Sequence, residues 1–424
     1  MTKGRLTVIS STGERLELGD GTGTPVVLRF NTAQAERGIA ANPALKVGEY
    51  YMDGEIDLPE GSIYDLIMLG YANAGRELMP AVWMKAFEKM RIVARRLHQL
   101  NTLPRARGNV RRHYDLSADL YRLFLDPDMQ YSCAYYPRPG LSLAQAQLLK
   151  KRHIAAKLRI AGGMEVLDIG CGWGGMGLYL AQVAGARVDG VTLSEEQLAV
   201  ARRRARTEGL AVDFRLQDYR EIERQYDRIV SVGMFEHVGI NHYDRFFRQS
   251  AAMLREDGVM LLHTIGRADP PGATNPFLQR YIFPGGYIPA LSEVMRAVEK
   301  SGLVVADIEI LRLHYAETLK AWRANFMARR EEAKAIYDEA FCRMWEFYLA
   351  GSEASFREGG MVVFQIQLAH RVGSVPATRD YIAEAEGKLA RKEAEHGIPG
   401  PAWPEDWPVQ RPAASAPRAC CGGS

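Results

Sequence analysis

The sequence predicts an α/β protein whose main domain is built on a parallel sheet, preceded by a small α+β domain. Strand-like and helix-like runs alternate between residues 165 and 265, and a glycine-rich turn follows the first of these strands. Because strands that alternate with helices pair in parallel, helices should cover both faces of the sheet. Ligands of such sheets bind at the carboxyl ends of the strands.

The expected elements follow in chain order. Residues 1 to about 60 contain β-like runs at 5–9 and 26–30, and residues 63 to about 100 have a helical pattern. From about residue 113 onward, strands are expected at 165–169, 187–193, 212–216, 227–232 and 259–265, with helices at 176–184, 195–207 and 243–254. Residues 266–289, rich in Gly, Pro and aromatic residues, should cap the site. Strands at 304–311 and 361–368 then flank helices at 315–335 and 336–350.

The length of 424 residues allows two domains and a tail. We expect an N-terminal domain at 1–112, the main domain at 113–371 and a tail at 372–424, whose Pro- and Ala-rich end from residue 399 should be disordered. The formal net charge of +3 is too small to predict a nucleic-acid partner. The five cysteines have neither a disulfide framework nor metal-ligand spacing, which favours a reducing cytoplasm and no metal site.

Any membrane contact is expected to be peripheral, because the sequence has no signal peptide and no apolar run of about 18 residues. Between Lys85 and Arg112, nine Lys or Arg residues accompany one Glu, with apolar side chains interleaved. This pattern favours a basic amphipathic helix on anionic lipid, although a solvated face on a linker helix fits it equally well. We therefore expect a cytoplasmic protein on the inner face of the membrane, and the same region is a candidate homodimer contact.

The turn at residues 165–175, EVLDIGCGWGG, points to the ligand of the sheet. Gly170, Gly172 and Gly175 fit the G-x-G-x-x-G pattern shared with NAD-binding proteins. Asp168, two places before the turn, would repel a pyrophosphate but suits the ammonium and sulfonium of S-adenosylmethionine (SAM). Asp189 has the spacing of the acid that binds a NAD ribose, but it precedes the expected end of its strand. The residues favour SAM over NAD or a turn without a ligand.

Eight motifs between about His113 and Leu368 resemble the cyclopropane fatty acid synthase family, which includes the mycolic acid cyclopropane synthases. In chain order they are HYDLS, LDPDMQYSCAYY, VLDIGCGWGG, VTLSEEQ, FEHVG, LLHTIG, IFPGG and HYAETL. The resemblance implies a class I SAM-dependent methyltransferase fold with a Rossmann-like, mostly parallel, seven-stranded sheet. It also implies that the substrate is a cis double bond in a membrane phospholipid acyl chain.

The resemblance assigns residues to the SAM site. The end of the second strand has Thr192, Leu193 and Ser194 where an acid usually binds the SAM ribose, and the resemblance carries that role to the backbone of Thr192 and Leu193 and to the side chain of Gln197. Ser194 reads equally as a helix N-cap, and a plain surface turn is the alternative for Asp218 and Tyr219. The complete expected set is Tyr131, Ser132, Asp168, Gly170, Gly172, Gly174, Thr192, Leu193, Gln197, Asp218, Tyr219, Val232 and Gly233.

A second group of residues should serve the chemistry. Methylation of an alkene yields a carbocation, which needs a site without water and a base that removes a methyl proton. The resemblance implies that this base is bicarbonate, held by the backbone of Val232 and Gly233 and by four side chains. These are Cys133, Glu236, His263 and Tyr315. Taken alone, Glu236 would read as a surface or capping residue and His263 as a core histidine.

The main functional hypothesis is a cyclopropane fatty acid synthase that uses SAM and bicarbonate. A close alternative is a related methyltransferase that gives a methyl- or methylene-branched acyl chain. From other classes, an NAD-dependent oxidoreductase and a non-catalytic lipid-binding protein with a vestigial SAM pocket remain open.

Overall fold

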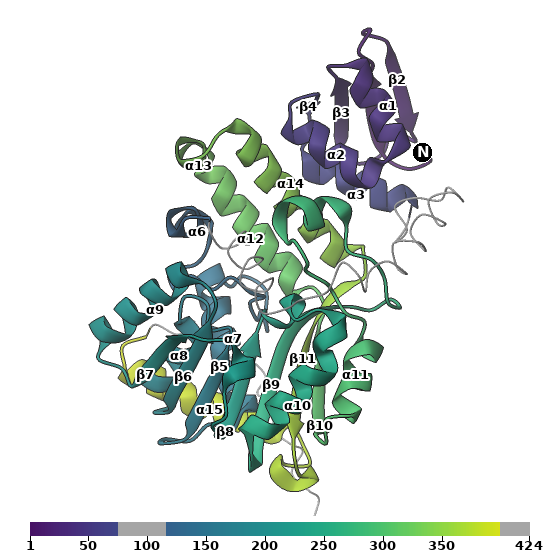
Figure 1. The fold of residues 1–424 in the computed structure, drawn as a ribbon. Helices are drawn as coiled ribbons and strands as arrows, with labels where there is room; N and C mark the ends of the chain where they lie inside the picture. The colour runs from purple at the N-terminus through teal and green to yellow at the C-terminus, as the bar shows by residue number, and fades with distance from the viewer. Residues whose placement is uncertain (75–115, 399–424) are drawn as a thin grey trace, which may run out of the picture.

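The protein has a small N-terminal sheet and a large central sheet, joined through a layer of helices (Figure 1). We describe a computed structural model over residues 1–74 and 116–398. The basic segment between Lys85 and Arg112 and the tail from residue 399 lie outside the described residues.

The N-terminal sheet has the order β2-β1-β3-β4, with β1 parallel to β3 and antiparallel to β2. The predicted runs correspond to β1 and β3, but the structure adds two strands and two helices that the sequence analysis missed. The elements are β1 Arg5–Ile9, β2 Arg15–Gly19, β3 Pro25–Phe30, α1 Ala33–Ala41, α2 Pro43–Met52, β4 Ile56–Glu60 and α3 Ile63–Ala74.

The central sheet has seven strands in the order β10-β11-β9-β8-β5-β6-β7. All neighbours pair in parallel except those of β11, which is antiparallel to both β9 and β10. The expected α/β class and the mostly parallel seven-stranded sheet are confirmed. The strands are β5 Glu165–Ile169, β6 Arg187–Thr192, β7 Val212–Leu216, β8 Tyr226–Val232, β9 Leu254–Arg267, β10 Val304–Leu311 and β11 Met361–Ala369.

Helices cover both faces of this sheet because successive strand residues point in opposite directions. Val166 packs with α7 Leu143–Lys157, α8 Gly175–Gln182 and α15 Asp380–Glu395. Leu167, the next residue, packs with α10 Tyr243–Met253 and α11 Leu291–Glu299. On the outer strands, α9 Glu195–Glu208 packs against β7.

Further helices stand between the central sheet and the N-terminal domain (Figure 1). They are α6 Ala118–Phe124, α12 His314–Ala328, α13 Arg330–Ile336 and α14 Glu339–Arg357. Three helices thus replace the two predicted over 315–350, because the backbone leaves helical geometry at Arg329 and Asp338 caps α14. The Tyr51 hydroxyl donates to Glu346 (3.0 Å), which fastens α2 to α14.

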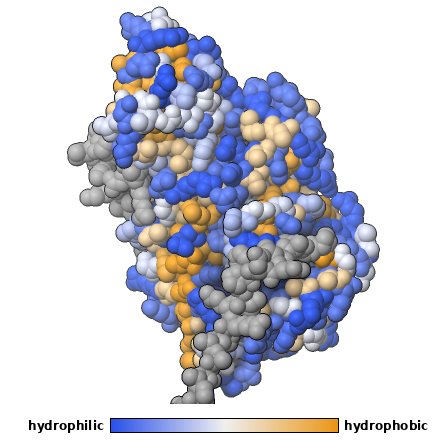
Figure 2. Space-filling view, turned by 180° about the vertical axis from the view of Figure 1, so that it is seen from behind, coloured by the Kyte–Doolittle hydropathy of each residue, from blue (hydrophilic) through white to orange (hydrophobic). Residues whose placement is uncertain are grey.

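Two further features concern the molecular surface and helix α15. Seen from behind, most of the surface is hydrophilic, with hydrophobic residues gathered in a narrow band below the N-terminal domain (Figure 2). Helix α15 lies in the segment that the sequence analysis assigned to the tail, and the buried Arg152 of α7 donates to its Glu393. Among residues 1–74 and 116–398, no helix is both long and apolar enough to cross a bilayer.

Candidate active site

The glycine turn after β5 has the backbone geometry that its composition predicts. Gly170 and Gly172 have φ of +82° and +53°, values that favour glycine. A Cβ on Gly170 would lie 2.6 Å from that of Met234, whereas a Cβ on Gly172 would meet nothing within 4 Å. Gly172 therefore leaves open space on the wall of a pocket. Gly174 does not line the pocket; it precedes α8 with φ of +89°.

This pocket lies at the carboxyl ends of β5, β6 and β8, where the doubly wound fold predicts a ligand. The structure brings together every expected SAM-site residue except Gly174. The lining residues from the expected set are Tyr131, Ser132, Asp168, Gly170, Gly172, Thr192, Leu193, Gln197, Asp218, Tyr219, Val232 and Gly233.

Asp168 is the only acidic residue of β5 that faces the pocket, and its side chain is 2% exposed. Burial raises the pKa of this carboxyl to about 7, although the positive charge of Lys150 lowers it. Its Oδ2 atom has no hydrogen-bond partner in the described part of the chain. A buried carboxyl without a partner is costly, and a cationic ligand group would relieve that cost. The ammonium of SAM fits this position.

At the end of β6, hydroxyl and amide groups bond to one another, and no carboxylate takes part in these bonds. The Thr192 hydroxyl donates to the side-chain Oε1 of Gln197 (3.2 Å). The Ser194 hydroxyl caps α9 by accepting from the backbone N–H of Gln197 (3.3 Å). The capping interpretation and the pocket interpretation of this segment thus hold together. Asp189 is turned away, towards Arg224 (3.1 Å) and the Tyr226 hydroxyl (2.8 Å). It does not line the pocket.

Asp218 and Tyr219 do not form the plain surface turn that was the alternative. Asp218 is 2% exposed and lines the pocket. Its carboxylate accepts from Arg220 through both oxygens, at 2.8 and 2.7 Å. This bidentate pair fixes the floor of the pocket beside the Tyr219 ring.

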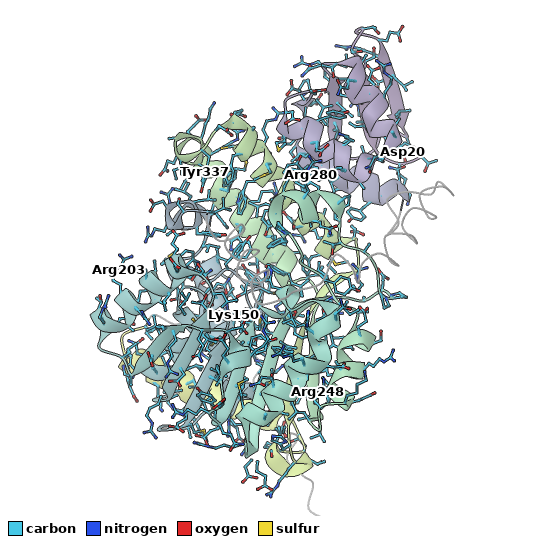
Figure 3. The ribbon with its side chains drawn as sticks, in the orientation of Figure 1. Asp20, Lys150, Arg203, Arg248, Arg280 and Tyr337 are labelled. Atoms are coloured by element: carbon cyan, nitrogen blue, oxygen red, sulfur yellow. The ribbon has the colours of Figure 1, made fainter. Side chains whose placement is uncertain are left out.

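A buried lysine supports the loop that carries Tyr131 and Ser132. Lys150 of α7 is 0% exposed and donates to Gln130 Oε1 (2.5 Å) and Ser132 Oγ (2.9 Å). In Figure 3 its label lies near the centre of the view, whereas Arg203 lies at the left edge. Burial lowers the pKa of Lys150 to about 8. Lys150 therefore places a cation behind the pocket wall.

Glu236 and His263 lie beside the pocket without lining it. The backbone N–H of Gly233 donates to the carbonyl of His263 (2.9 Å), and that of Ile265 donates to Glu236 Oε1 (2.6 Å). Both side chains are buried. Burial raises the pKa of Glu236 to about 6 and lowers that of His263 well below its ordinary value. Glu236 Oε2 and His263 Nε2 have no partner among residues 1–74 and 116–398.

Cys133 and Tyr315 belong to one apolar cluster, and Ile265, whose N–H donates to Glu236, packs against it. Burial raises the pKa of the Cys133 thiol far above its usual value, and the thiol donates to the Ala134 carbonyl (3.3 Å). A neutral thiol is a poor nucleophile, so Cys133 is not placed to attack the substrate. Tyr315 packs edge-on to Trp322, which also stacks on the ring of Tyr131. Aromatic faces therefore connect the pocket to Tyr315.

Sequence reasoning missed several lining residues, including Gln130, Trp173, Arg220, Met234 and His237. It also missed Lys150. Most of these residues stand within one to three positions of a predicted one, so proximity in sequence was a usable signal. Lys150 had no such signal, because KKRH in a helix is typical of a solvated face.

Comparisons with known proteins identify the family of this chain. The mycolic acid cyclopropane synthetase family matches residues 101–366, and a domain of unknown function, DUF7884, matches residues 3–80. The cyclopropane-fatty-acyl-phospholipid synthase of Escherichia coli is 37% identical over 82% of this chain and 89% of its own. The tuberculostearic acid methyltransferase UfaA1 of Mycobacterium tuberculosis is 36% identical over 83% of this chain and 86% of its own.

A solved structure gives the same result for the fold and the cofactor. The mycolic acid cyclopropane synthase CmaA1, complexed with S-adenosylhomocysteine and CTAB, has a TM-score of 0.59 and 35% identity over 62% of this chain and 97% of its own. These matches contradict the NAD-dependent alternative. The chain belongs to the mycolic acid cyclopropane synthetase family and is a SAM-dependent methyltransferase.

Proposed function

We propose that this enzyme transfers a methylene group from SAM to the cis double bond of phospholipid acyl chains and closes a cyclopropane ring. The observation that carries the proposal is a pair of buried atoms beside the pocket, Glu236 Oε2 and His263 Nε2, for which the described residues supply no hydrogen-bond partner. Buried polar atoms nearly always have a partner, so two such atoms next to a methyl-donor pocket indicate a bound polar group. The acyl chain of a phospholipid has no polar group that could bind these two atoms.

The residues present fit a bicarbonate ion. Glu236 can accept a hydrogen bond from its hydroxyl, and the neutral imidazole of His263 can donate one to an oxygen. The thiol of Cys133 is buried and stays protonated, so it adds no competing negative charge. When bound there, bicarbonate would supply the base that takes a proton from the transferred methyl group.

The protein's own residues would prepare both reactants. Asp168 and the Gly170–Gly172 turn would orient SAM, whose methyl group is the electrophile. As the alkene electrons form the new carbon–carbon bond, the carbon–sulfur bond breaks and sulfur keeps its electron pair. The aromatic groups around Tyr315 would exclude water and stabilise the resulting cation on the acyl chain. Loss of a methyl proton then closes the ring.

The experiment is an assay with vesicles of cis-monounsaturated phospholipid, SAM and added bicarbonate, followed by mass spectrometry of the acyl chains. We expect a gain of one CH2 per modified chain, with trans-monounsaturated vesicles as the control. A Glu236→Gln variant should bind SAM but turn over poorly. If this variant kept full function, the non-catalytic lipid-binding alternative would be favoured. Unmodified cis chains with the parent protein would refute the proposal.

We also propose that residues 85–112 and the N-terminal domain bring the enzyme to the inner face of the membrane, and that this region forms a homodimer contact. Its charge supports the first part, because anionic lipid attracts basic segments by about 1 kcal/mol per Lys or Arg. The fraction of the protein that sediments with anionic vesicles should fall at high salt. Binding that ignores salt would contradict the electrostatic part, and a monomer in analytical ultracentrifugation would contradict the dimer.

A further inference from the structure

Within the part of the chain that the structure describes, His263 has a hydrogen-bond partner on one ring nitrogen only. It lies on β9 directly opposite Gln365 of β11, and both side chains are buried. The Nδ1 atom of His263 is 3.2 Å from Gln365 Nε2, whereas its Nε2 atom has no partner in the described chain. Which nitrogen carries the proton thus depends on how the Gln365 amide is oriented.

Lys157 determines this orientation. The oxygen and nitrogen of a glutamine amide look alike, so the surroundings must assign them. Lys157 Nζ lies 3.0 Å from Gln365 Oε1, and an ammonium group can only donate. The amide oxygen must therefore face Lys157. The amide N–H then donates to Nδ1 of His263, which must accept.

Lys157 is itself fixed from the other side. Its ammonium donates to Glu309 of β10, and the same carboxylate oxygen is 2.7 Å from Nε2 of His153. Nδ1 of His153 lies 2.7 Å from Glu386 of α15. The neighbouring charges of Lys157 and His153 lower the pKa of Glu309, which keeps this carboxylate ionised despite its partial burial. Lys157 is therefore held in place from β10 and, through His153, from α15.

We propose that Gln365 and Lys157 are positioning residues that hold His263 as the Nε2–H tautomer, so that it presents a hydrogen-bond donor to the anion at the base site. Because burial keeps His263 neutral, the ring has one N–H group only. With the amide reversed, Nε2 would present a lone pair that repels an anion. The anion itself rests on the proposed function, but the tautomer does not.

The test is Gln365→Glu, which keeps the shape but replaces the donor by an acceptor. The matched control is Gln367→Glu: Gln367 lies two residues further along β11, is equally buried and donates to the Lys157 carbonyl and the Tyr381 hydroxyl. We expect ¹⁵N-histidine NMR of the parent to show the proton of His263 on Nε2, with the signal assigned by its loss in His263→Asn. Gln365→Glu should put a proton on Nδ1, whereas Gln367→Glu should leave the ring unchanged.

The second readout is turnover at increasing concentrations of added bicarbonate, in buffer from which dissolved carbon dioxide has been removed. Gln365→Glu should raise the bicarbonate concentration needed for half-maximal rate by roughly ten- to hundredfold, with SAM affinity unchanged. Should Gln365→Glu fail to fold, Lys157→Met serves instead and should give a mixture of tautomers and a weaker bicarbonate response.

Two results overturn the proposal: a proton on Nδ1 of His263 in the parent protein, or an Nε2–H tautomer that survives both substitutions. If the tautomer changes as expected but no variant responds to bicarbonate, the proposed base fails and the positioning role stands. The two failures are therefore distinguishable.

Discussion

The ammonium group of Lys150 lies 2.9 Å from the hydroxyl oxygen of Ser132, a residue that lines the SAM pocket. Because Lys150 donates to this oxygen, the Ser132 hydroxyl hydrogen is free to point elsewhere, and the pocket is the open direction. The carboxylate end of SAM would then meet a hydroxyl donor with a cation behind it.

Lys150→Met should weaken SAM binding by roughly tenfold, because the variant keeps the length of the side chain and removes its charge. Isothermal titration with SAM checks this. Lys151→Met is the control, since Lys151 pairs with Asp128 rather than with the pocket wall. Equal affinities of the parent protein and Lys150→Met would show that the cation has no role in SAM binding.

Asp168→Asn should make the ligand-free enzyme less sensitive to pH. The pKa of Asp168 is raised from 3.8 to about 7, so its contribution to stability is present below pH 3.8 and is lost as pH rises through 7. Between pH 5 and 8 the free energy of unfolding of the parent should fall by roughly 2.5 to 3 kcal/mol, whereas that of the variant should not. Denaturant unfolding at both pH values measures this difference.

The same substitution should cost most of the SAM affinity, because the ammonium of SAM would lose its carboxylate. A variant with the parent's pH dependence, or with the parent's affinity, would contradict the assignment of Asp168.

Turnover should fall as pH drops through about 6, where Glu236 becomes protonated and can no longer accept a hydrogen bond as a carboxylate. A bound anion would raise this pKa further, so the fall should begin at or above pH 6. The assay must keep the bicarbonate ion concentration constant at each pH. Glu236→Gln should lower turnover by about a hundredfold or more while SAM affinity is retained. If the residual turnover of Glu236→Gln still fell as pH dropped through about 6, a group other than Glu236 would cause this pH dependence.

Glu393→Gln should destabilise the protein by about 3 kcal/mol or more, because it leaves the charge of Arg152 buried without its partner. The exposed pair of Arg371 and Glu256 is the control, and Arg371→Ala should change stability little. Urea unfolding measures the change in stability of both variants. If Glu393→Gln unfolds like the parent, α15 is not an integral part of the main domain.

Much of the main domain could be predicted because its strands are short apolar runs bounded by turns. The predicted runs at 165–169, 212–216 and 304–311 coincide with β5, β7 and β10. In contrast, β4 was missed because IDLPE is brief, contains Pro and is partly exposed. The bounds of the helices over 315–350 were wrong because their breaks depend on local backbone geometry and caps.

The polar supports of the site could not be predicted, because their partners are distant in sequence. Lys150, Lys151, Arg152, His153 and Lys157 look like a solvated helix face, yet all are buried. Lys150 donates to Gln130 and Ser132, and the carboxylate partners of the other four come from a preceding loop, β10 and α15. Only the folded chain brings those charges together. The pocket itself was accessible to sequence reasoning because its residues follow the ends of consecutive strands.

In the proposed reaction, the base removes a proton from the transferred methyl group. SAM whose methyl group carries three deuterium atoms, supplied with cis-monounsaturated phospholipid vesicles, shows whether this proton is lost. We predict acyl chains that gain CD2, have lost their vinyl protons and show cyclopropane ring protons in NMR. Chains that gain CD3 and lose a hydrogen of their own would contradict this proposal and assign the enzyme to methyl-branched products.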